Sequence, residues 1–374
     1  MLASSLLTFE LVSSTNVGQV TEVWVQPPFS EADYVIGVYN STYYYSRNST
    51  TGKYDYLSSN ATYVIQSSLN TFTDTTGGSL FFRTGYYYIT NTIYVKTQGV
   101  KLYGSSYNRA IIKLSNGANK NMVDITGPKC EIVDLLFWGN SAQQSVETIG
   151  IYAHCSPAGQ DLHLDHVVVY DVKGTGVKSE GSWDMFSNCF TESNTNVGWW
   201  IAGANSQLIG CESYKDTAAD ANPASIYITG SNNRVVGCKV YSPDSTGKRG
   251  IEIVGGSGNI IDACDVILTN QDGIYLMQAS KNIVSNCIIK DCGKLANNTY
   301  VAIGLMYNGT TYSTYNVISN NIISSSQTNK PKYGIQEENA NCNYNDIIGN
   351  IVLNCATAAI QKLGANSISE HNIV

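Results

Sequence analysis

A repeat of about 26 residues runs through most of the chain and restricts its fold more than any other feature. Five segments share one pattern, in which an apolar residue lies three positions before a cysteine and a small or apolar residue lies two positions after it. The cysteines are Cys189, Cys211, Cys238, Cys264 and Cys287. The same frame continues, in steps of 22 to 34 residues, at Asp134, His166, Asn321, Asn350 and Asn372. A period of this length is typical of solenoids and other repeat architectures.

A second motif, a small residue followed by an apolar one, has the same period. It occurs at Gly150-Ile151, Gly176-Val177, Gly198-Trp199, Ser225-Ile226, Gly250-Ile251, Gly273-Ile274, Ala302-Ile303, Gly334-Ile335 and Ala359-Ile360. Short β-branched runs alternate with Gly, Asn and Asp turns, and no amphipathic helix lies between them, which excludes βαβ units. We therefore predict a coil of short parallel strands, in which successive turns lie about 4.8 Å apart and like residues stack on like.

The chain resembles the right-handed parallel β-helix proteins of the pectate-lyase superfamily, which include extracellular polysaccharide-active enzymes and viral tailspike-like proteins. The most specific match is residues 59–70 followed by 77–88. In that family the first segment is a helix that caps the coil, and the second is the first full turn. Val64, Ile65, Leu69 and Phe72 form the apolar face that such a cap needs. The resemblance extends from about residue 34 to the C-terminus and implies an all-β, right-handed, single-stranded parallel β-helix with an N-terminal capping α-helix.

Three segments follow from this assignment: a β-rich arm and hairpin over 1–58, the capping helix over 59–76, and the β-helix over 77–374. The tyrosine-rich stretch around 48–52 predicts the hairpin. Residues 1–30 have two interpretations, an attachment or oligomerisation arm or a strand along the coil.

Charge and hydropathy restrict the partners. With 22 Lys+Arg against 29 Asp+Glu the net charge is −7, which argues against nucleic acid. No apolar run is long enough to span a membrane, so we expect no membrane insertion. The first basic residue is Arg47, so the positive n-region of a secretory signal is missing; we expect either that the export signal has been removed or that the chain leaves the cell inside something else, such as a virion. The superfamily resemblance favours an extracellular or virion-surface location, and Asn-x-Ser/Thr sequons support it at Asn40, Asn48, Asn60, Asn297 and Asn308.

The residues that follow the apolar position of the second motif should face outward in one column. This column is Tyr152, Lys178, Trp200, Tyr227, Glu252, Tyr275, Gly304, Gln336 and Gln361. Its aromatic rings predict a glycan-binding strip with a polysaccharide as the partner. The alternative is that tyrosine is common in this chain and favours strands.

Two acidic clusters are candidates for chemistry. Glu252 and Asp272, with Arg249, lie one turn apart and could act as the acid pair of an inverting glycosidase, or Arg249 and Asp272 could form an ion pair beside a solvated Glu252. Asp161, His163 and Asp165 alternate along one strand face and are a candidate for a metal site. His166 falls on the cysteine column, so we expect it to be an interior residue.

The catalytic motifs of polygalacturonases and pectate lyases do not occur in this sequence, so no functional residue transfers from the superfamily, and we expect no cofactor. Ten cysteines could form disulfides in an exported protein, but five of them in one column are better explained as stacked free thiols. We predict a glycan-binding surface protein, with a polysaccharide lyase or glycoside hydrolase and a structural spike subunit as alternatives. Side-by-side association, for example as a trimer, is a further expectation.

Overall fold

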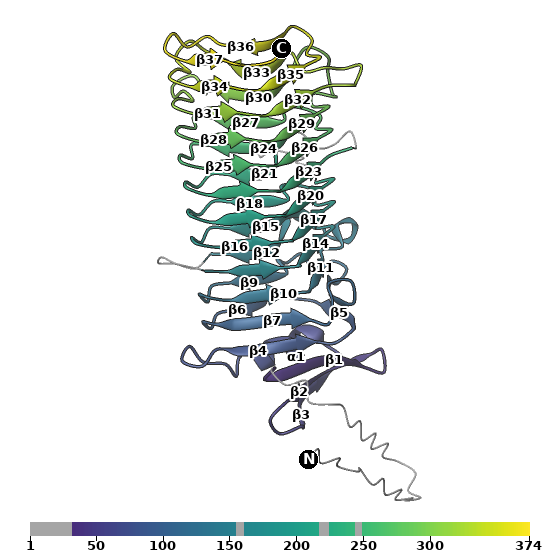
Figure 1. Cartoon of the computed structure of the whole chain (residues 1–374). Coiled ribbons are helices and arrows are strands. Elements are labelled where there is room, and N and C mark those ends of the chain that lie inside the picture. Colours follow the sequence, from purple (N-terminus) through teal and green to yellow (C-terminus); the bar gives the residue numbers. More distant parts are fainter. Residues whose placement is uncertain (1–31, 155–160, 217–223, 244–248) are drawn as a thin grey trace, which may run out of the picture. The chain divides into compact units, whose positions relative to one another are not determined.

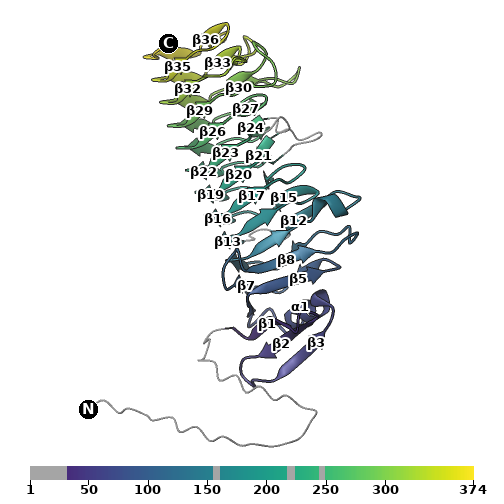
Figure 2. The same ribbon diagram turned by 90° about the vertical axis from the view of Figure 1, so that its right-hand side faces the viewer.

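The protein forms a coil of parallel strands with one short α-helix near its start, as the computed structural model in Figures 1 and 2 shows. The structure describes residues 32–154, 161–216, 224–243 and 249–374. Residues 32–374 are one compact unit. The alternative roles of residues 1–30 concern residues outside the described ranges. In the described part no helix has the length and apolarity that a membrane span requires.

Three sheets run along the coil. Sheet A has 15 strands in the order β3 (Tyr54–Ser58), β2 (Tyr43–Asn48), β1 (Tyr34–Tyr39), β4 (Gly78–Phe82), β7 (Val100–Gly104), β10 (Glu131–Val133), β13 (His163–Asp165), β16 (Met185–Ser187), β19 (Gln207–Ile209), β22 (Arg234–Val236), β25 (Ile260–Asp262), β28 (Ile283–Ser285), β31 (Val317–Ser319), β34 (Asp346–Ile348) and β37 (Ile368–Glu370).

Sheet B has 11 strands, β5 (Gly85–Ile89), β8 (Ala110–Leu114), β11 (Leu136–Trp138), β14 (Val168–Tyr170), β17 (Phe190–Glu192), β20 (Glu212–Tyr214), β23 (Lys239–Tyr241), β26 (Asp265–Ile267), β29 (Ile288–Lys290), β32 (Ile322–Ser324) and β35 (Ile351–Leu353). Sheet C also has 11, β6 (Ile93–Val95), β9 (Val123–Ile125), β12 (Thr148–Ala153), β15 (Gly174–Ser179), β18 (Trp199–Ile201), β21 (Ala224–Ile228), β24 (Arg249–Val254), β27 (Ile274–Met277), β30 (Val301–Met306), β33 (Tyr333–Glu337) and β36 (Ala358–Gln361). Each turn adds one strand to each sheet, which confirms the predicted parallel coil.

The first 40 described residues close one end of the coil. β1, β2 and β3 form an antiparallel meander, which includes the predicted hairpin, and β1 also pairs in parallel with β4. Helix α1 (Ala61–Leu69) is shorter than the predicted segment 59–76 and begins at Asn60, whose side chain accepts a hydrogen bond from the Tyr63 backbone N–H. Its buried residues Val64, Ile65 and Leu69 cover the apolar end of the stack, as predicted.

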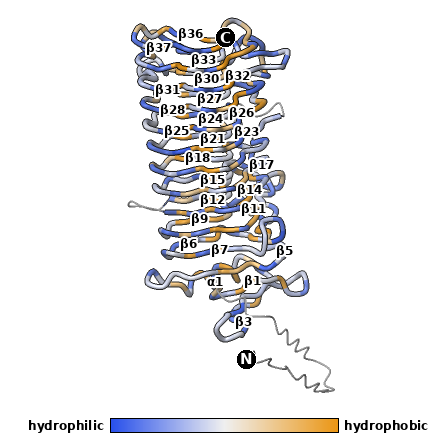
Figure 3. The backbone as a smooth tube through the Cα atoms, viewed as in Figure 1, coloured by the Kyte–Doolittle hydropathy of each residue, from blue (hydrophilic) through white to orange (hydrophobic). Residues whose placement is uncertain are grey.

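The interior is one continuous apolar core, because alternate residues of most strands in the coil point inward. Figure 3 shows apolar residues recurring on the strands of successive turns. The cysteines of the column are buried and free, Cys355 is half-buried, and Cys155 lies outside the described residues. Their thiols donate to backbone carbonyls of the neighbouring turn, for example Cys211 to the Phe186 oxygen at 3.3 Å.

The column frame was wrong by one residue in the earliest turns. Strand register aligns Ile132 and Leu164 with Phe186, so Leu135 and Val167 share the Cys189 position. Asp134 and His166 instead lie at the bend just before it, with φ of 54° and 51°. His166 is therefore not an interior residue: half of its side chain is exposed, and Nδ1 lies 3.0 Å from the Asp165 carboxylate.

Asparagine ladders hold the bends together. At one bend the side chains of Asn233, Asn259, Asn282, Asn316 and Asn345 are buried, and each of the last four accepts a backbone N–H from the asparagine one turn before it. A second ladder runs from Asn321 through Asn350 to Asn372, with side-chain amide bonds of 3.0 Å. Because each amide carries a donor and an acceptor, such a column satisfies buried backbone groups without adding charge.

Asp184 occupies the same ladder position two turns below Asn233. It accepts the Leu162 N–H, and its own N–H donates to Ser206, which continues into the ladder. The carboxyl is fully buried, and this burial raises its pKa to about 6. Because the folded pKa lies above the unfolded one, the contribution of this group to stability is complete below about pH 4 and is lost as the pH rises through 6.

We predict that Asp184→Asn raises the free energy of unfolding at pH 7.5, by at most about 3 kcal/mol, because it removes a buried charge and keeps the acceptor for Leu162. The gain should vanish near pH 4. Urea unfolding at both pH values measures it. The control Asp262→Asn should instead lower the free energy of unfolding at pH 7.5. Hydrogen bonds from Ser285 and Asn286 lower the pKa of the Asp262 carboxyl, so its ionised form stabilises the fold. A variant equally stable or less stable than the wild type at pH 7.5 would contradict the prediction.

Candidate functional site

The outward column of sheet C is a continuous row of stacked positions. Strand register confirms the predicted column from Tyr152 to Gln361 without a break. It also extends the column downward to Tyr94 and Asp124. These two residues do not follow from the repeat motif, because Ile93 and Val123, which precede them, do not come after a small residue.

The lower half of the column is accessible. Lys178 and Trp200 are half-buried, and the Lys178 ammonium lies 4.3 Å from the Trp200 ring centroid and 5.1 Å from that of Tyr152. The rings of Trp200 and Tyr227 meet edge to face at 5.6 Å. The indole N–H of Trp200 donates to the Thr229 hydroxyl at 3.3 Å. These contacts hold the rings in place on an open face, the condition for stacking against a ligand.

Ionisable groups flank the aromatic row. The Tyr152 hydroxyl donates to Glu180 at 2.9 Å, and the Lys178 ammonium lies 2.6 Å from the same carboxylate. Burial and the bond to Glu180 raise the pKa of Tyr152 to about 12, so its hydroxyl keeps its proton at neutral pH. Partial burial alone would raise the pKa of Glu180, but its bonds from Lys178 and Tyr152 hold that pKa below the usual range.

His154, which was not singled out from the sequence, lies beside Tyr152 in the lower half of the column. His154 Nε2 lies 2.7 Å from the Asp124 carboxylate, and the imidazole stacks on the Tyr152 ring with centroids 4.2 Å apart. The strand alternation that places Tyr152 outward gives His154 the same side of β12 two residues later, so a sequence signal existed. Among the described residues of sheet C, an imidazole and a phenol meet at Tyr152 and His154.

Arg249, Glu252 and Asp272 form a single buried cluster. Nε of Arg249 donates to Asp272 and Nη1 donates to Glu252, both at 3.0 Å. Burial raises the pKa of Glu252 and of Asp272; it opposes ionisation of Arg249 as well, but the carboxylates raise the guanidinium pKa overall. The predicted Arg249–Asp272 ion pair is confirmed, but Glu252 is 2% exposed and not solvated. Its Oε2 has no hydrogen-bond partner among the described residues.

Two positions midway along the column, Glu252 and Tyr275, are covered by the chain itself. Tyr275 stacks under the Arg249 guanidinium at 3.7 Å and is 8% exposed. It packs with Val301, Met306 and Tyr333 in a small apolar cluster outside the main core. The Val301 N–H donates to Asp272. The predicted strip is therefore at least partly exposed from Tyr94 to Tyr227 and is interrupted at the buried Glu252 and Tyr275 before Gln336 and Gln361.

Asp161, His163 and Asp165 lie on the face of sheet A, away from the column. His163 Nδ1 is 3.7 Å from Glu131, and Asp165 binds Ser187 and His166. Within the described ranges no three His, Cys, Asp or Glu side chains are placed to share a metal ion. Partners for Asp165 inside the protein lower its pKa despite partial burial.

Sheet B carries a second aromatic row that the sequence analysis did not identify, made of Trp138, Tyr170, Tyr214 and Tyr241. The signal was a tyrosine three residues after Cys211 and after Cys238. Tyr214 and Tyr241 stack in parallel, 5.6 Å apart at 12°. Parallel stacking covers one face of each ring, so this row offers a ligand less ring surface than the edge-to-face pair on sheet C.

Comparison with known proteins identifies the family of this fold. The family model described as right handed beta helix region matches residues 175–321 and 215–374, which together cover more than half of the chain. The chain belongs to the right-handed β-helix family. No curated protein sequence matches it.

Solved structures resemble this β-helix along most of its length. The A-module of mannuronan C-5 epimerase AlgE6 of Azotobacter vinelandii is 19% identical, with a TM-score of 0.60 over 84% of this chain and 95% of that one. The enzymatically active domain of bacteriophage CBA120 tailspike protein 2 is 16% identical, with a TM-score of 0.60 over 79% and 48%. The tailspike of E. coli bacteriophage HK620, in complex with a pentasaccharide, is 12% identical, with a TM-score of 0.60 over 84% and 62%. At these identities the likeness shows the fold alone.

We predict that Arg249→Met lowers the free energy of unfolding by about 3–5 kcal/mol at pH 7.5, because it leaves two buried carboxylates without a cation. Both carboxyls have raised pKa values, so protonation at pH 5 removes part of the unpaired charge and the loss should shrink. Chemical denaturation at the two pH values measures this.

Lys239→Met is the matched control, since the side chains of Lys239 and its partner Glu212 are 44% and 32% exposed, far more than those of the buried cluster. We expect that variant to lose less than about 1 kcal/mol. An equally small loss in Arg249→Met would show that the cluster does not stabilise the fold.

Proposed function

We propose that this β-helix binds a glycan along the open half of the sheet C column, from Tyr94 to Tyr227, and that it acts outside a cell or on a virion surface. The observation that carries the proposal is the edge-to-face pair of Trp200 and Tyr227 next to the Lys178 ammonium. A T-shaped pair leaves ring surface uncovered, and apolar sugar faces pack on such surface while sugar hydroxyls bond to polar neighbours.

A comparison of sheets B and C supports sheet C as the glycan-binding face. Sheet C combines rings with ionised donors and acceptors within a few ångströms, namely Lys178, Glu180 and Asp124. On sheet B the two best stacked rings cover one another. Among the proteins of similar fold, a phage tailspike was solved with a pentasaccharide and a GH87 α-1,3-glucanase with tetrasaccharides. These two proteins of similar fold were thus solved with oligosaccharides, and we infer an oligosaccharide ligand here.

Replacing both Trp200 and Tyr227 with Ala should reduce glycan-array binding at least tenfold, because each ring contributes stacking area to the ligand. The matched control is Tyr214→Ala with Tyr241→Ala, which removes two rings from sheet B and should leave binding unchanged. Thermal unfolding of both double variants checks that the coil remains intact.

Unchanged glycan binding in the double variant of Trp200 and Tyr227 would show that the sheet C column is not the binding surface. A structural spike subunit, whose strip is a subunit interface, gives a different pattern: no glycan signal, and a fall in oligomer size in the sheet C variant. Analytical ultracentrifugation of the wild type and the variant measures that size and also tests the trimer expected from the sequence.

A second candidate function is polysaccharide cleavage by a lyase at Tyr152 and His154. In the tautomer that donates from Nε2 to the Asp124 carboxylate, Nδ1 of His154 carries the lone pair of a base. The Tyr152 hydroxyl, protonated at neutral pH, is a proton donor one ring away. His154 would take a proton from a sugar carbon, the C–H electrons would form a double bond, the C–O bond would break, and Tyr152 would protonate the leaving oxygen.

This site differs from the pair inferred from the sequence, Glu252 and Asp272, because the guanidinium of Arg249 is bonded to both carboxylates and both are nearly inaccessible. His154→Ala and Tyr152→Phe should each lower the rate of depolymerisation by about 100-fold or more. Formation of unsaturated sugar ends, followed by ultraviolet absorbance, measures the rate. Glu252→Gln should keep the wild-type rate; a large loss in Glu252→Gln alone would return catalysis to the buried cluster.

A further inference from the structure

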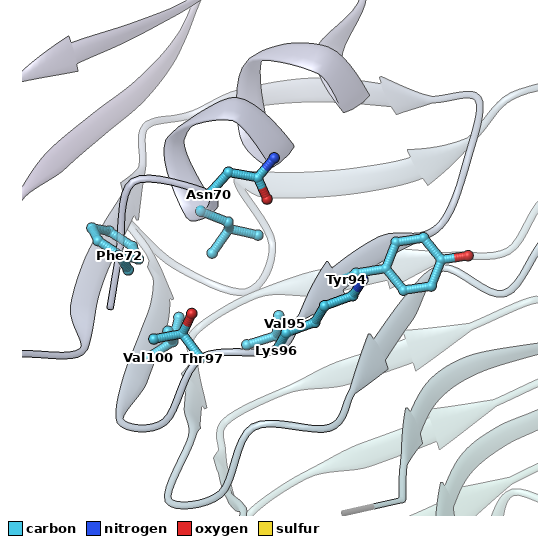
Figure 4. Close-up of a pocket in the computed structure, with 8 residues that line it drawn as sticks. Asn70, Phe72, Tyr94, Val95, Lys96, Thr97 and Val100 are labelled. Carbon is cyan, nitrogen blue, oxygen red and sulfur yellow. The ribbon is translucent and has the colours of Figure 1, made fainter. Parts of the chain in front are cut away.

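The lower end of the sheet C column leads into a pocket of about 250 Å³ under helix α1 (Figure 4). Its apolar wall is formed by Phe72, Val95 and Val100, and its polar rim by Asn70, Lys96 and Thr97. In Figure 4 Asn70 and Thr97 lie on opposite sides of the opening, and Tyr94 lies at the side away from Phe72. The pocket thus combines an apolar wall with hydrogen-bonding groups, the composition of a small-molecule site.

The pocket and the aromatic row are one surface. Tyr94, at the pocket edge, is the first residue of the column, and Asp124 and Tyr152 follow on the next two turns. Five turns separate Tyr94 from Tyr227, which corresponds to roughly 24 Å along the coil axis. An extended oligosaccharide lying along the column would therefore meet the pocket at one end.

The pocket is held open by the way the helix caps sheet C. β6 is the edge strand of that sheet, and the Gln66 side chain takes the place of a further strand: its oxygen accepts the Tyr94 N–H at 2.8 Å and its amide donates to the Tyr94 carbonyl at 3.1 Å. The same amide donates to Asn70 at 2.9 Å. Gln66 thereby fixes Tyr94 and Asn70 relative to each other, and the pocket is preformed.

Lys96 is the charged residue that lines the pocket. Its ammonium lies 5.3 Å from the Tyr94 ring centroid and makes no ion pair within the described part of the chain. Along the open column, Lys178 is neutralised by Glu180, and Asp124 contacts His154. Lys96 is thus free to donate hydrogen bonds to a ligand in the pocket.

We propose that this pocket is a terminal subsite, which holds the sugar unit at one end of the glycan while the rest of the chain lies on the column. The inference rests on the proposed glycan face and adds chain-end recognition to it. The helix closes the column at the pocket, so a chain that fills it cannot continue past α1. The protein would then recognise where a polysaccharide ends, in addition to its repeating unit.

The test compares one polysaccharide in two states. The probe is the glycan with the strongest array signal, used intact and after mild acid cleavage into short fragments at equal mass. Cleavage multiplies chain ends without changing the repeating unit, so a terminal subsite predicts at least tenfold tighter binding per unit mass to the fragments, measured by titration calorimetry. Lys96→Ala and the pocket-filling Thr97→Phe should abolish this preference and retain binding to the intact chain.

Lys101→Ala is the matched control, because it removes a lysine from the sheet A face and should keep the preference. Equal affinity of the wild type for intact and cleaved glycan overturns the terminal subsite but leaves the glycan face standing. Unchanged binding in the Trp200→Ala and Tyr227→Ala double variant overturns the glycan face itself, so the two failures are distinguishable. Thermal unfolding of Thr97→Phe shows whether the helix still caps the coil, and Lys96→Ala provides the second measurement if it does not.

Discussion

Backbone hydrogen bonding between successive turns is the constraint on which the rest of the structure depends. Once each strand pairs in register with its counterpart one turn away, every side chain acquires a neighbour of the same position above and below. Apolar positions then make a continuous core, cysteines and asparagines make buried columns, and outward positions make rows on the surface. The candidate site is one of those rows, so its residues are adjacent although they lie more than 20 positions apart in the sequence.

The sequence was sufficient to predict this pairing where the repeat is regular. From Cys189 to Asn350 the spacing of apolar and small residues locates each strand, and the column from Tyr152 to Gln361 was correct at every turn. The prediction of the cysteine column was wrong where loops change the spacing. Asp134 and His166 lie one residue before that column, at a bend with positive φ. Side-chain type could not reveal the shift, since Asp and His tolerate a bend as well as Asn does.

Accessibility could not be predicted from the column, because it depends on segments that cross the face from other turns. Glu252 and Tyr275 share a row with Tyr227, yet Arg249 and the cluster of Val301, Met306 and Tyr333 cover them. Conversely, His154 and Asp124 are unremarkable in the sequence and become a pair only because β9 and β12 are neighbours. The chemistry of the face therefore follows from which loops cover it and which leave it open.

Because strands pair only with the turns directly above and below, the coil can gain or lose a whole turn without new contacts elsewhere. Duplication of a turn between helix α1 and Trp200, for example residues 178–199, would move the Trp200 and Tyr227 pair a further 4.8 Å or so from the helix, with the core and both ladders preserved. The distance from the cap to the Trp200 and Tyr227 pair is then a molecular ruler. Its length is set in whole turns, and evolution can adjust it by unequal recombination within the repeats.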